Sequence, residues 1–542
     1  MGAFSRALAS HRWTEKSRRW LFVPYDQLSD EIGPLSREDP KELGIVVVEC
    51  PEKAARRPYH KQKLALVLTN LRHFAIEQAA RGVAVRHVVG VSYAAALEGL
   101  TAELGPLRVM RPAERELRVE LAPLFDRGAL LEIPHEGWLT KREDLQGPGP
   151  WRMDAFYRGV RRRLGVLMKG GKPVGGKLSF DAENRQAWPG SPPAPAAPTF
   201  EVDAITEEVC ELVASRMAHH PGALRPEALP ATRADAEQTW RWSKQHCLPL
   251  FGPFEDAMST RSRTLFHTRI SPLLNLGRLR PKQIVDDVER MDIPLSSKEG
   301  FIRQVLGWRE FVHHVHDATD GFRVLRGVTQ PTASGPGKGG FDGWSEEPWP
   351  AAPGGDGGSL TSVLGADRPV PPAYWGSSSG LRCLDEVVAA VWEDGYSHHI
   401  TRLMVLSNIA TLLDVSPREL TDWFWVAYID AYDWVVEPNV HAMGTFGVGD
   451  LMTTKPYVAG SAYIDKMSDY CESCRFDPKK SCPFPSLYWA FLGRHRDALA
   501  GVDRMKLPLA SEARRTAAQR RHDAEVFERV AAALARGETL AP

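Results

Sequence analysis

The spacing of short apolar runs in the first 134 residues restricts the fold of this chain more than any other feature. Five runs of four to seven residues lie at 20–23, 45–48, 83–89, 107–110 and 130–133. Between the second and third runs, residues 60–81 have the apolar spacing of a helix and are followed by Gly82, which favours helix termination. Short buried strands that alternate with helices predict a parallel, doubly wound α/β sheet.

Two carboxylic acids stand at the ends of the first two predicted strands. Asp26 follows the first run, and Glu49 follows the second. Parallel sheets bind ligands at the carboxyl ends of their strands, so this edge is a predicted ligand site. No G-x-G-x-x-G pattern follows the first run, which excludes the standard dinucleotide fingerprint there.

A proline-rich segment separates this region from the rest of the chain. Residues 186–200 hold five prolines in fifteen positions, which is typical of a stiff, extended connector. Beyond it the apolar spacing is helical, and Ser416, Pro417 and Glu419 are typical of a helix start. We expect an N-terminal extension at 1–19, an α/β domain at 20–145, a linker at 146–200, an all-α domain at 201–512 and a C-terminal helix at 513–542.

One segment interrupts the helical pattern. Residues 327–358 contain 10 glycines and 5 prolines in 32 positions, a composition that does not pack into a core. We therefore expect a flexible surface insertion, with outer limits at 327–372.

The charge balance limits the classes of partner. Lys plus Arg and Asp plus Glu both total 68, so a nucleic-acid partner must meet a local basic patch rather than a generally basic protein. Arg158 and Arg161 to Arg163 form one dense basic segment. The chain has no signal-peptide pattern and no run of 18 apolar residues, so we expect a cytoplasmic monomer with no membrane contact.

Three of the seven cysteines lie close together near the C-terminus. Cys471, Cys474 and Cys482 fall within twelve positions, and Cys383 is the nearest other cysteine in the sequence. This density of thiols suits a soft-metal centre. A triplet, one remote cysteine and a proline after the last thiol favour a [4Fe-4S] cluster over tetrahedral zinc, which stays an alternative, as does a set of reduced structural thiols.

Two further patterns are compatible with redox or acid–base chemistry. Six aromatic residues lie between Trp423 and Trp434, on a predicted helix; they either fill a core or relay electrons to a buried cofactor. His398 and His399 are neighbours at the start of a helical pattern. One of them is a candidate proton donor, and the alternative is an ordinary surface or core position.

Several longer motifs occur together in the order found in one protein family. They are 154–158 (DAFYR), 175–185 (GGKLSFDAENR), 300–311 (GFIRQVLGWREF), 396–405 (YSHHITRLMV), 430–434 (DAYDW), 467–471 (MSDYC) and 482–484 (CPF). Across roughly residues 20–510 the chain resembles the iron–sulfur bacterial cryptochrome/photolyase family, which includes prokaryotic (6-4) photolyases.

The resemblance implies an α/β antenna domain and an all-helical domain that binds FAD. It also implies a [4Fe-4S] cluster on Cys383, Cys471, Cys474 and Cys482. The implied activity is blue-light-driven electron transfer from reduced FAD to a (6-4) pyrimidine–pyrimidone photoproduct in UV-damaged DNA. The damaged base has to be flipped out of the helix because the flavin cannot reach a stacked base.

The resemblance also implies roles for individual residues. Those expected to bind FAD are Thr268, Ser271, Gln304, Arg309, Arg402, Asn408 and Asp430. His398 and His399 are expected on the lesion side, and Trp423 and Trp375 in the photoreduction chain. Asp26 and Glu49 match positions that hold a 6,7-dimethyl-8-ribityllumazine antenna.

One departure from the family pattern bears on function. Relatives commonly carry a glutamate near the flavin N5 edge, where this chain has Val436 and the acid is displaced to Glu437. A carboxylate there helps to set the stable flavin protonation state. DNA repair is the leading hypothesis. The alternatives are a non-repairing blue-light photoreceptor that signals through a protein partner, and a light-independent iron–sulfur flavoprotein.

Overall fold

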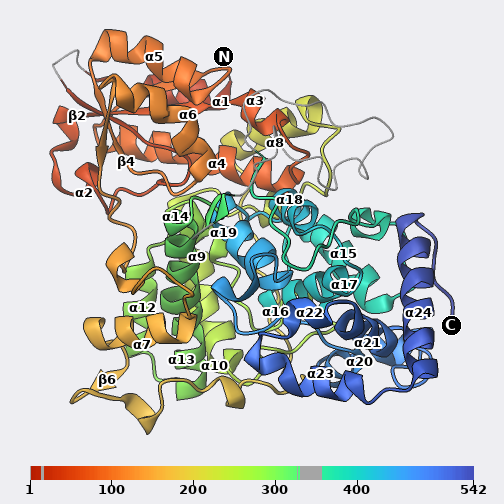
Figure 1. Cartoon of the computed structure of the whole chain (residues 1–542). Coiled ribbons are helices and arrows are strands. Elements are labelled where there is room, and N and C mark those ends of the chain that lie inside the picture. Colours follow the sequence, from red (N-terminus) through yellow and green to blue (C-terminus); the bar gives the residue numbers. More distant parts are fainter. Residues whose placement is uncertain (1, 14–17, 326–327, 330–356) are drawn as a thin grey trace.

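The computed structural model describes residues 2–13, 18–325, 328–329 and 357–542. The chain forms two lobes, an α/β lobe in red and orange and a larger helical lobe in green and blue (Figure 1). The long C-terminal helix α24 (Ala517–Ala535) packs along α21 (Phe484–Arg494) at the edge of the helical lobe. Among the described residues, no helix is both long and apolar enough to cross a membrane.

The α/β lobe contains the predicted parallel sheet. Its strands are β1 (Arg19–Phe22), β2 (Leu43–Glu49), β3 (Ala84–Val89), β4 (Leu107–Met110) and β5 (Leu130–Ile133). They pair in the order β3-β2-β1-β4-β5, all parallel, with Leu21 opposite Ile45 in the register of the central pair. The strand order reverses at β1, which is the position where doubly wound sheets bind ligands. The predicted fold class and all five strands are confirmed.

Helices connect the strands and cover the sheet. They are α2 (Pro34–Arg37), α3 (Pro51–Ala55), α4 (Lys61–Ala80), α5 (Tyr93–Leu104) and α6 (Arg115–Asp126). The predicted helix over 60–81 is α4, and the His60 ring caps its start by accepting a hydrogen bond from the Gln62 N–H.

Both segments that flank the sheet region in sequence also pack onto it. Helix α1 (Ala3–Ser10) lies in the predicted N-terminal extension and buries Phe4 in the core formed by the sheet and α4. Helix α8 (Ala204–Arg216), which follows the proline-rich connector, packs on α4, and its Glu208 pairs with Arg72 at 2.8 Å. The proline-rich connector therefore leads back to the α/β lobe before the chain enters the helical lobe.

The helical lobe is built from short helices around two large apolar clusters, and the second cluster continues into the α/β lobe through residues such as Phe22, Val46 and Val109. Its remaining α-helices are α7 (Met153–Leu164), α9 (Arg233–Trp242), α10 (Leu248–Phe251), α11 (Ser271–Asn275), α12 (Pro281–Arg290), α13 (Leu295–Ile302), α14 (Glu310–Ala318), α15 (Arg382–Asp394), α16 (His399–Thr401), α17 (Asn408–Leu412), α18 (Pro417–Ala427), α19 (Asp433–Val436), α20 (Ser461–Met467), α22 (Arg496–Leu499) and α23 (Lys506–Ala513). Four π-helical segments interrupt them: η6 (Ser243–Cys247), η7 (Arg303–Arg309), η10 (Arg402–Ser407) and η11 (Glu437–Gly444). Within the described residues, two two-stranded ribbons are also present, β6 (Met168–Lys169) with β7 (Lys172–Pro173) and β8 (Val324–Leu325) with β9 (Val328–Thr329).

The glycine- and proline-rich insertion falls mostly outside the described residues, namely at 326–327 and 330–356. Its predicted end at residue 372 is wrong, because the chain is packed well before that point. Ser359 and Val370 are buried, and the Val370 N–H donates to the Glu419 carboxylate at 2.9 Å. As predicted, Glu419 lies in the first turn of a helix, whose cap is the Ser416 hydroxyl.

Candidate functional site

A large cavity in the helical lobe collects most of the predicted cofactor-binding residues. Its volume is about 1060 Å³. The predicted residues in its wall are Thr268, Ser271, Gln304, Arg309, His399, Arg402 and Asp430. These positions are spread over 163 residues of sequence (268–430), so only the tertiary fold brings them together.

The π-helical segments η7, η10 and η11 all contribute to this wall. Gln304 and Arg309 lie on η7, Arg402 on η10, and Val440 and Met443 on η11. π-Helical turns inside α-helices occur frequently at functional sites because they displace side chains from the regular helical positions. Their presence makes the cavity a candidate functional site on grounds that do not depend on the sequence motifs.

An ion pair between Arg402 and Asp430 fixes one side of the cavity. Both guanidinium Nη atoms reach the carboxylate oxygens at 3.0 Å, and Arg402 Nε donates to the Ser397 carbonyl at 2.7 Å. The Ser271 hydroxyl donates to Asp430 at 2.6 Å. Burial alone would lower the pKa of Arg402, but the neighbouring Asp430 raises it. The Arg402 guanidinium is thus charged and held in place in the cavity wall.

Three histidines form a compact group beside the cavity. The ring of His398 stacks on that of His267 with centroids 4.4 Å apart, and His399 meets His267 edge-on at 5.5 Å. The imidazole nitrogens of the three lie within 4.8 Å of one another. Sequence reasoning missed His267, because nothing in the sequence links it to a pair more than 130 positions away.

The two predicted histidines occupy different environments. His398 is 3% exposed, and burial, with His399 and Arg402 adding to it, lowers its pKa to about 3. The His399 side chain is 40% exposed and lies 3.8 Å from the carboxylate of Asp256. Burial raises the pKa of Asp256, but the hydrogen bond and charge of His399 outweigh it and hold that pKa below its ordinary value.

Asn408 differs from the other predicted cofactor residues. It is fully buried and is not part of the cavity wall. Its amide forms two hydrogen bonds with the backbone of Ala459, one in each direction, at 2.9 and 3.1 Å. Ala459 does line the cavity, so Asn408 supports the wall from behind.

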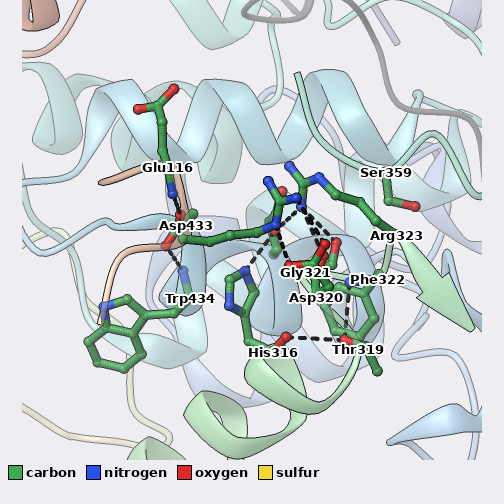
Figure 2. A network of polar contacts seen from close by, with 12 residues as sticks. Glu116, His316, Thr319, Asp320, Gly321, Phe322, Arg323, Ser359, Asp433 and Trp434 are labelled. Carbon is green, nitrogen blue, oxygen red and sulfur yellow. Dashed lines mark hydrogen bonds and ion pairs between the residues drawn. The ribbon is translucent and has the colours of Figure 1, made fainter. Parts of the chain in front are cut away.

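The displaced acid Glu437 points away from the cavity. Val436 and Asn439 line the wall, whereas Glu437 accepts hydrogen bonds from His316 at 2.8 Å and from Arg418 at 2.8 Å. Figure 2 shows His316 and Arg323 in this buried network, with Asp433 and Trp434 beside it. The one-residue shift therefore moves the carboxylate into a structural network and leaves an apolar side chain at the cavity.

The four predicted metal-ligating cysteines converge although they come from distant segments. Cys383 at the start of α15 joins Cys471, Cys474 and Cys482 around a gap of about 20 Å³. Burial, followed by the charges of the other three thiols, raises the pKa of Cys383 well above its ordinary value. Cys50, Cys210 and Cys247 lie elsewhere and are buried.

The aromatic run does not lie on one helix, contrary to the prediction. Helix α18 ends at Ala427, and α19 begins only at Asp433, because Tyr428 and Tyr432 have extended backbone. The run divides accordingly: Phe424 and Trp434 line the cavity, and Trp423 is fully buried behind it.

The predicted pair Trp423 and Trp375 is connected by a third indole. Trp392 lies 5.9 Å from Trp423 and stacks on Trp375 at 5.1 Å, measured between ring centroids. Sequence reasoning missed Trp392, although it stands on a predicted helix six positions before His398.

The carboxylates at the strand ends do not share a cavity. Asp26 borders a space of about 20 Å³, and Glu49 borders a different one of about 110 Å³. Burial opposes ionisation of Glu49, but hydrogen bonds from His87 and Arg72 hold its pKa at about 2. Burial raises the pKa of Asp26 to about 6. The structure therefore does not bring these two residues to one ligand.

The arginines of the basic segment on α7 have different environments. Arg161 is 1% exposed and donates to the carbonyls of Val166, Leu167 and Leu178, which is a structural role. Arg158 lines the mouth of the large cavity and is about half exposed.

Comparisons with known proteins show what this chain is similar to. A family profile described as "Deoxyribodipyrimidine photo-lyase-related protein" matches residues 21–229. A (6-4) photolyase from Agrobacterium fabrum is 33% identical over 520 residues, which cover 90% of this chain and 94% of the relative.

Two solved structures share the fold. A bacterial class III photolyase from Agrobacterium tumefaciens aligns with a TM-score of 0.52 and 16% identity, over 96% of this chain and 98% of its own. A cryptochrome from Synechocystis aligns with a TM-score of 0.50 and 15% identity, over 80% and 83% of the two chains.

Proposed function

Because this chain belongs to the photolyase/cryptochrome family, we propose that it binds FAD and uses blue light to repair (6-4) pyrimidine–pyrimidone photoproducts in DNA. The observation that carries the proposal is the large cavity: seven of the residues expected from the family motifs line it, and one of them, His399, is partly exposed.

The cavity fits FAD in size and chemistry. Its volume of about 1060 Å³ is at the upper end of typical ligand sites, which hold roughly 300–1,000 Å³. Buried nitrogens of two wall residues, Arg309 Nε and His267 Nε2, have no protein partner and are available to a polar ligand. When bound, FAD would supply light-driven one-electron chemistry, and the Arg402–Asp430 pair would hold its ring edge.

His399 is the better candidate for the proton donor. A histidine that gives a proton to a substrate must carry that proton near neutral pH. The low pKa of His398 keeps it neutral, whereas His399 lines the cavity, is partly exposed and lies 3.8 Å from the carboxylate of Asp256. Stacked on His267, His398 is a positioning residue.

The cysteine site fits an iron–sulfur cluster better than a single zinc ion. A tetrahedral zinc site with bonds of about 2.3 Å places its sulfurs about 3.8 Å apart. In the described part of the chain, groups of three or more metal-ligating side chains with all ligand atoms within 4.8 Å of one another are limited to the three histidines, so the cysteines are spaced more widely. We therefore assign Cys383, Cys471, Cys474 and Cys482 to a [4Fe-4S] cluster.

The three indoles of Trp423, Trp392 and Trp375 support photoreduction of the flavin. Trp423 contacts Phe424 in the cavity wall at 5.2 Å, and the next two rings follow at similar spacing. We propose that electrons move along this series toward FAD.

A lumazine antenna is not part of the proposal. The spaces beside Asp26 and Glu49 are about 20 and 110 Å³, well below the roughly 300 Å³ of small ligand sites. The oxygens of Glu49 already accept hydrogen bonds from Arg72 and His87.

Cationic groups at the cavity mouth suit a DNA partner. The cavity wall includes Arg152, Arg158, Arg185, Lys455 and Arg504. Arginine and lysine side chains supply most of the affinity of proteins for the phosphate backbone. A chain with zero formal net charge would thus present its basic patch at the site where the lesion has to enter.

Repair of an oligonucleotide that carries one (6-4) photoproduct tests the proposal. The reduced protein should restore the bases under blue light and not in darkness. His399→Ala should lower the rate at least about 100-fold, the usual effect of losing a general acid, while FAD stays bound. His522→Ala, an exposed histidine on α24, is the matched control. Unchanged turnover in His399→Ala would contradict the assignment.

One observation favours a second candidate, a light sensor that does not repair DNA. Val436 lines the cavity where relatives carry an acid, and Glu437 is committed to His316 and Arg418. Flavin photoreduction by the wild-type protein without any repaired product would support this candidate over the first.

A further inference from the structure

Two series of indole rings leave the FAD cavity. The first, which we call the Trp375 branch, runs from Trp423 through Trp392 to Trp375. The second, the Trp138 branch, begins with Trp434 in the cavity wall and continues to Trp138, whose ring lies edge-on at 5.2 Å. The Trp138 branch is shorter and starts at the wall itself, so ring distances alone would make it a competitor for electron donation.

The Trp375 branch runs past a hydrogen-bond acceptor. The backbone carbonyl of Tyr374 accepts hydrogen bonds from the indole N–H of Trp423 at 3.0 Å and of Trp392 at 2.9 Å. The partial negative charge of a carbonyl oxygen stabilises positive charge on a ring that donates to it. Both rings therefore lie in a setting that favours loss of an electron.

The Trp138 branch contains a largely buried cation, whose side chain is 14% exposed. The guanidinium carbon of Arg309 lies 4.2 Å from the ring centroid of Trp138 and 5.3 Å from that of Trp434. Among the described residues, its ion-pair partner is Glu310 at 3.4 Å, and the other oxygen of Glu310 accepts hydrogen bonds from the N–H and hydroxyl of Thr140. Burial lowers the pKa of Arg309 to about 10, so the group stays charged at neutral pH.

A ring that gives up an electron becomes a radical cation. A fixed positive charge 4–5 Å away raises the free energy of that cation, and little water is present to screen it. On the premise of the proposed flavin photochemistry, we propose that Arg309 prevents the Trp138 branch from donating an electron, so that the Trp375 branch alone reduces the flavin.

The electron balance of the Trp375 branch is simple. With FAD bound, Trp423 would give up one electron to the light-excited flavin, Trp392 would return one to Trp423, and Trp375 would return one to Trp392. A thiol in solution would then supply one electron to Trp375, releasing its proton to water and becoming a thiyl radical, and two such radicals combine to a disulfide. Charge leaves the cavity by this route, and no covalent bond in the chain is broken.

The test first removes Trp423, the first ring of the Trp375 branch, and then the positive charge of Arg309 in the Trp138 branch. Trp423→Phe should abolish most photoreduction per bound flavin. Adding Arg309→Gln should restore it at least about tenfold over Trp423→Phe alone, because a Coulomb barrier is removed. Transient absorption should then show a tryptophan radical.

Two further combinations complete the test. Arg309→Lys, which keeps the charge, should not restore photoreduction in the Trp423→Phe background. Trp138→Phe should abolish the activity that Arg309→Gln restores. Failure of Arg309→Gln to raise the yield, with FAD bound and the wild type active, would overturn the inference. A wild type without bound, photoreducible flavin would instead contradict the proposed function.

A single variant covers the case in which Arg309 substitutions lose FAD. Trp138→Phe in the wild-type background should leave the yield and the radical signal unchanged, because the branch is closed. A yield lowered by half or more would show that Trp138 donates despite Arg309 and would overturn the inference.

Discussion

The cavity of the helical lobe and the strand-end spaces of the α/β lobe differ in how much room the fold leaves for a ligand. Family motifs predicted a ligand at both places. The helical cavity encloses about 1060 Å³, while the strand-end spaces hold about 20 and 110 Å³. The open helical cavity supports the proposed FAD site, whereas the smaller spaces leave less room between the protein's own side chains.

Several buried charges at the strand ends are paired within the protein. At the strand ends, Lys53 binds Glu114 and donates to the Tyr25 hydroxyl, and Arg57 pairs with Glu116 at 2.9 Å. Buried charges that are paired within the protein need no ligand. Polar atoms without a protein partner remain at both places: Arg309 Nε and His267 Nε2 in the wall of the helical cavity, and Asp26 Oδ1 and the Tyr432 hydroxyl at the strand-end spaces.

The largest effect that we expect concerns the cysteine site, which belongs to the helical lobe alone. Cys474→Ser should remove the iron and most of the soluble protein, because metal bonds contribute on the order of 10 kcal/mol to folding in small metal sites. The loss of the cluster is measured as iron per chain, and the loss of folded protein as soluble yield. Cys210→Ser, a buried cysteine on α8, should keep its iron. An iron-replete, stable Cys474→Ser protein would remove this residue from the ligand set.

Breaking the cavity's ion pair should be the next most damaging change. Arg402→Gln leaves Asp430 buried without its partner, which should lower the free energy of unfolding by about 3–5 kcal/mol and release FAD. Arg402→Lys keeps the charge but loses the bidentate geometry, so it should retain part of the flavin. Chemical unfolding gives the free energy of unfolding, and flavin absorbance gives the FAD occupancy. Full FAD occupancy in Arg402→Gln would contradict a ligand-holding role.

The matching change in the α/β lobe should affect stability without affecting FAD. Lys53→Met leaves Glu114 unpaired, but burial already raises the pKa of Glu114 well above its ordinary value, so this acid can take up a proton. We expect a smaller loss, roughly 1–3 kcal/mol. Loss of FAD from this variant would show that the two regions are not independent.

A further effect that we expect in the α/β lobe depends on pH. The pKa of Asp26 is about 6 in the folded protein against an ordinary 3.8, so its contribution to stability is complete below pH 4 and is lost as the pH rises through 6. That loss is about 3 kcal/mol at about 1.4 kcal/mol per unit. Asp26→Asn should therefore melt at a higher temperature than the wild type at pH 8, and the gap should close near pH 4. A difference in melting temperature that does not change with pH would rule out ionisation of Asp26 as its cause.

Local sequence patterns were sufficient for the fold of the α/β lobe. All five strands lie where apolar runs stand, and α18 starts at the cap predicted from Ser416. These features depend on residues that are neighbours in the sequence, so they can be predicted from one sequence alone. The break between α18 and α19 was missed because aromatic residues fit both helix and extended backbone.

The candidate site could be predicted only in part. The motifs identified the residues that line the cavity, but not those that join them through long-range packing, such as His267, Trp392 and Trp138. They also placed Asn408 in the wall, although it supports the wall from behind. Which face a side chain presents depends on contacts between segments that no local pattern encodes.

The most direct test of this account is a census of the organic chromophores released from the denatured wild-type protein. Chromatography with absorbance detection identifies and counts them against protein concentration. The contrast between the two regions predicts one FAD per chain and no second chromophore. Protein without flavin, or with a stoichiometric lumazine beside the FAD, would contradict it.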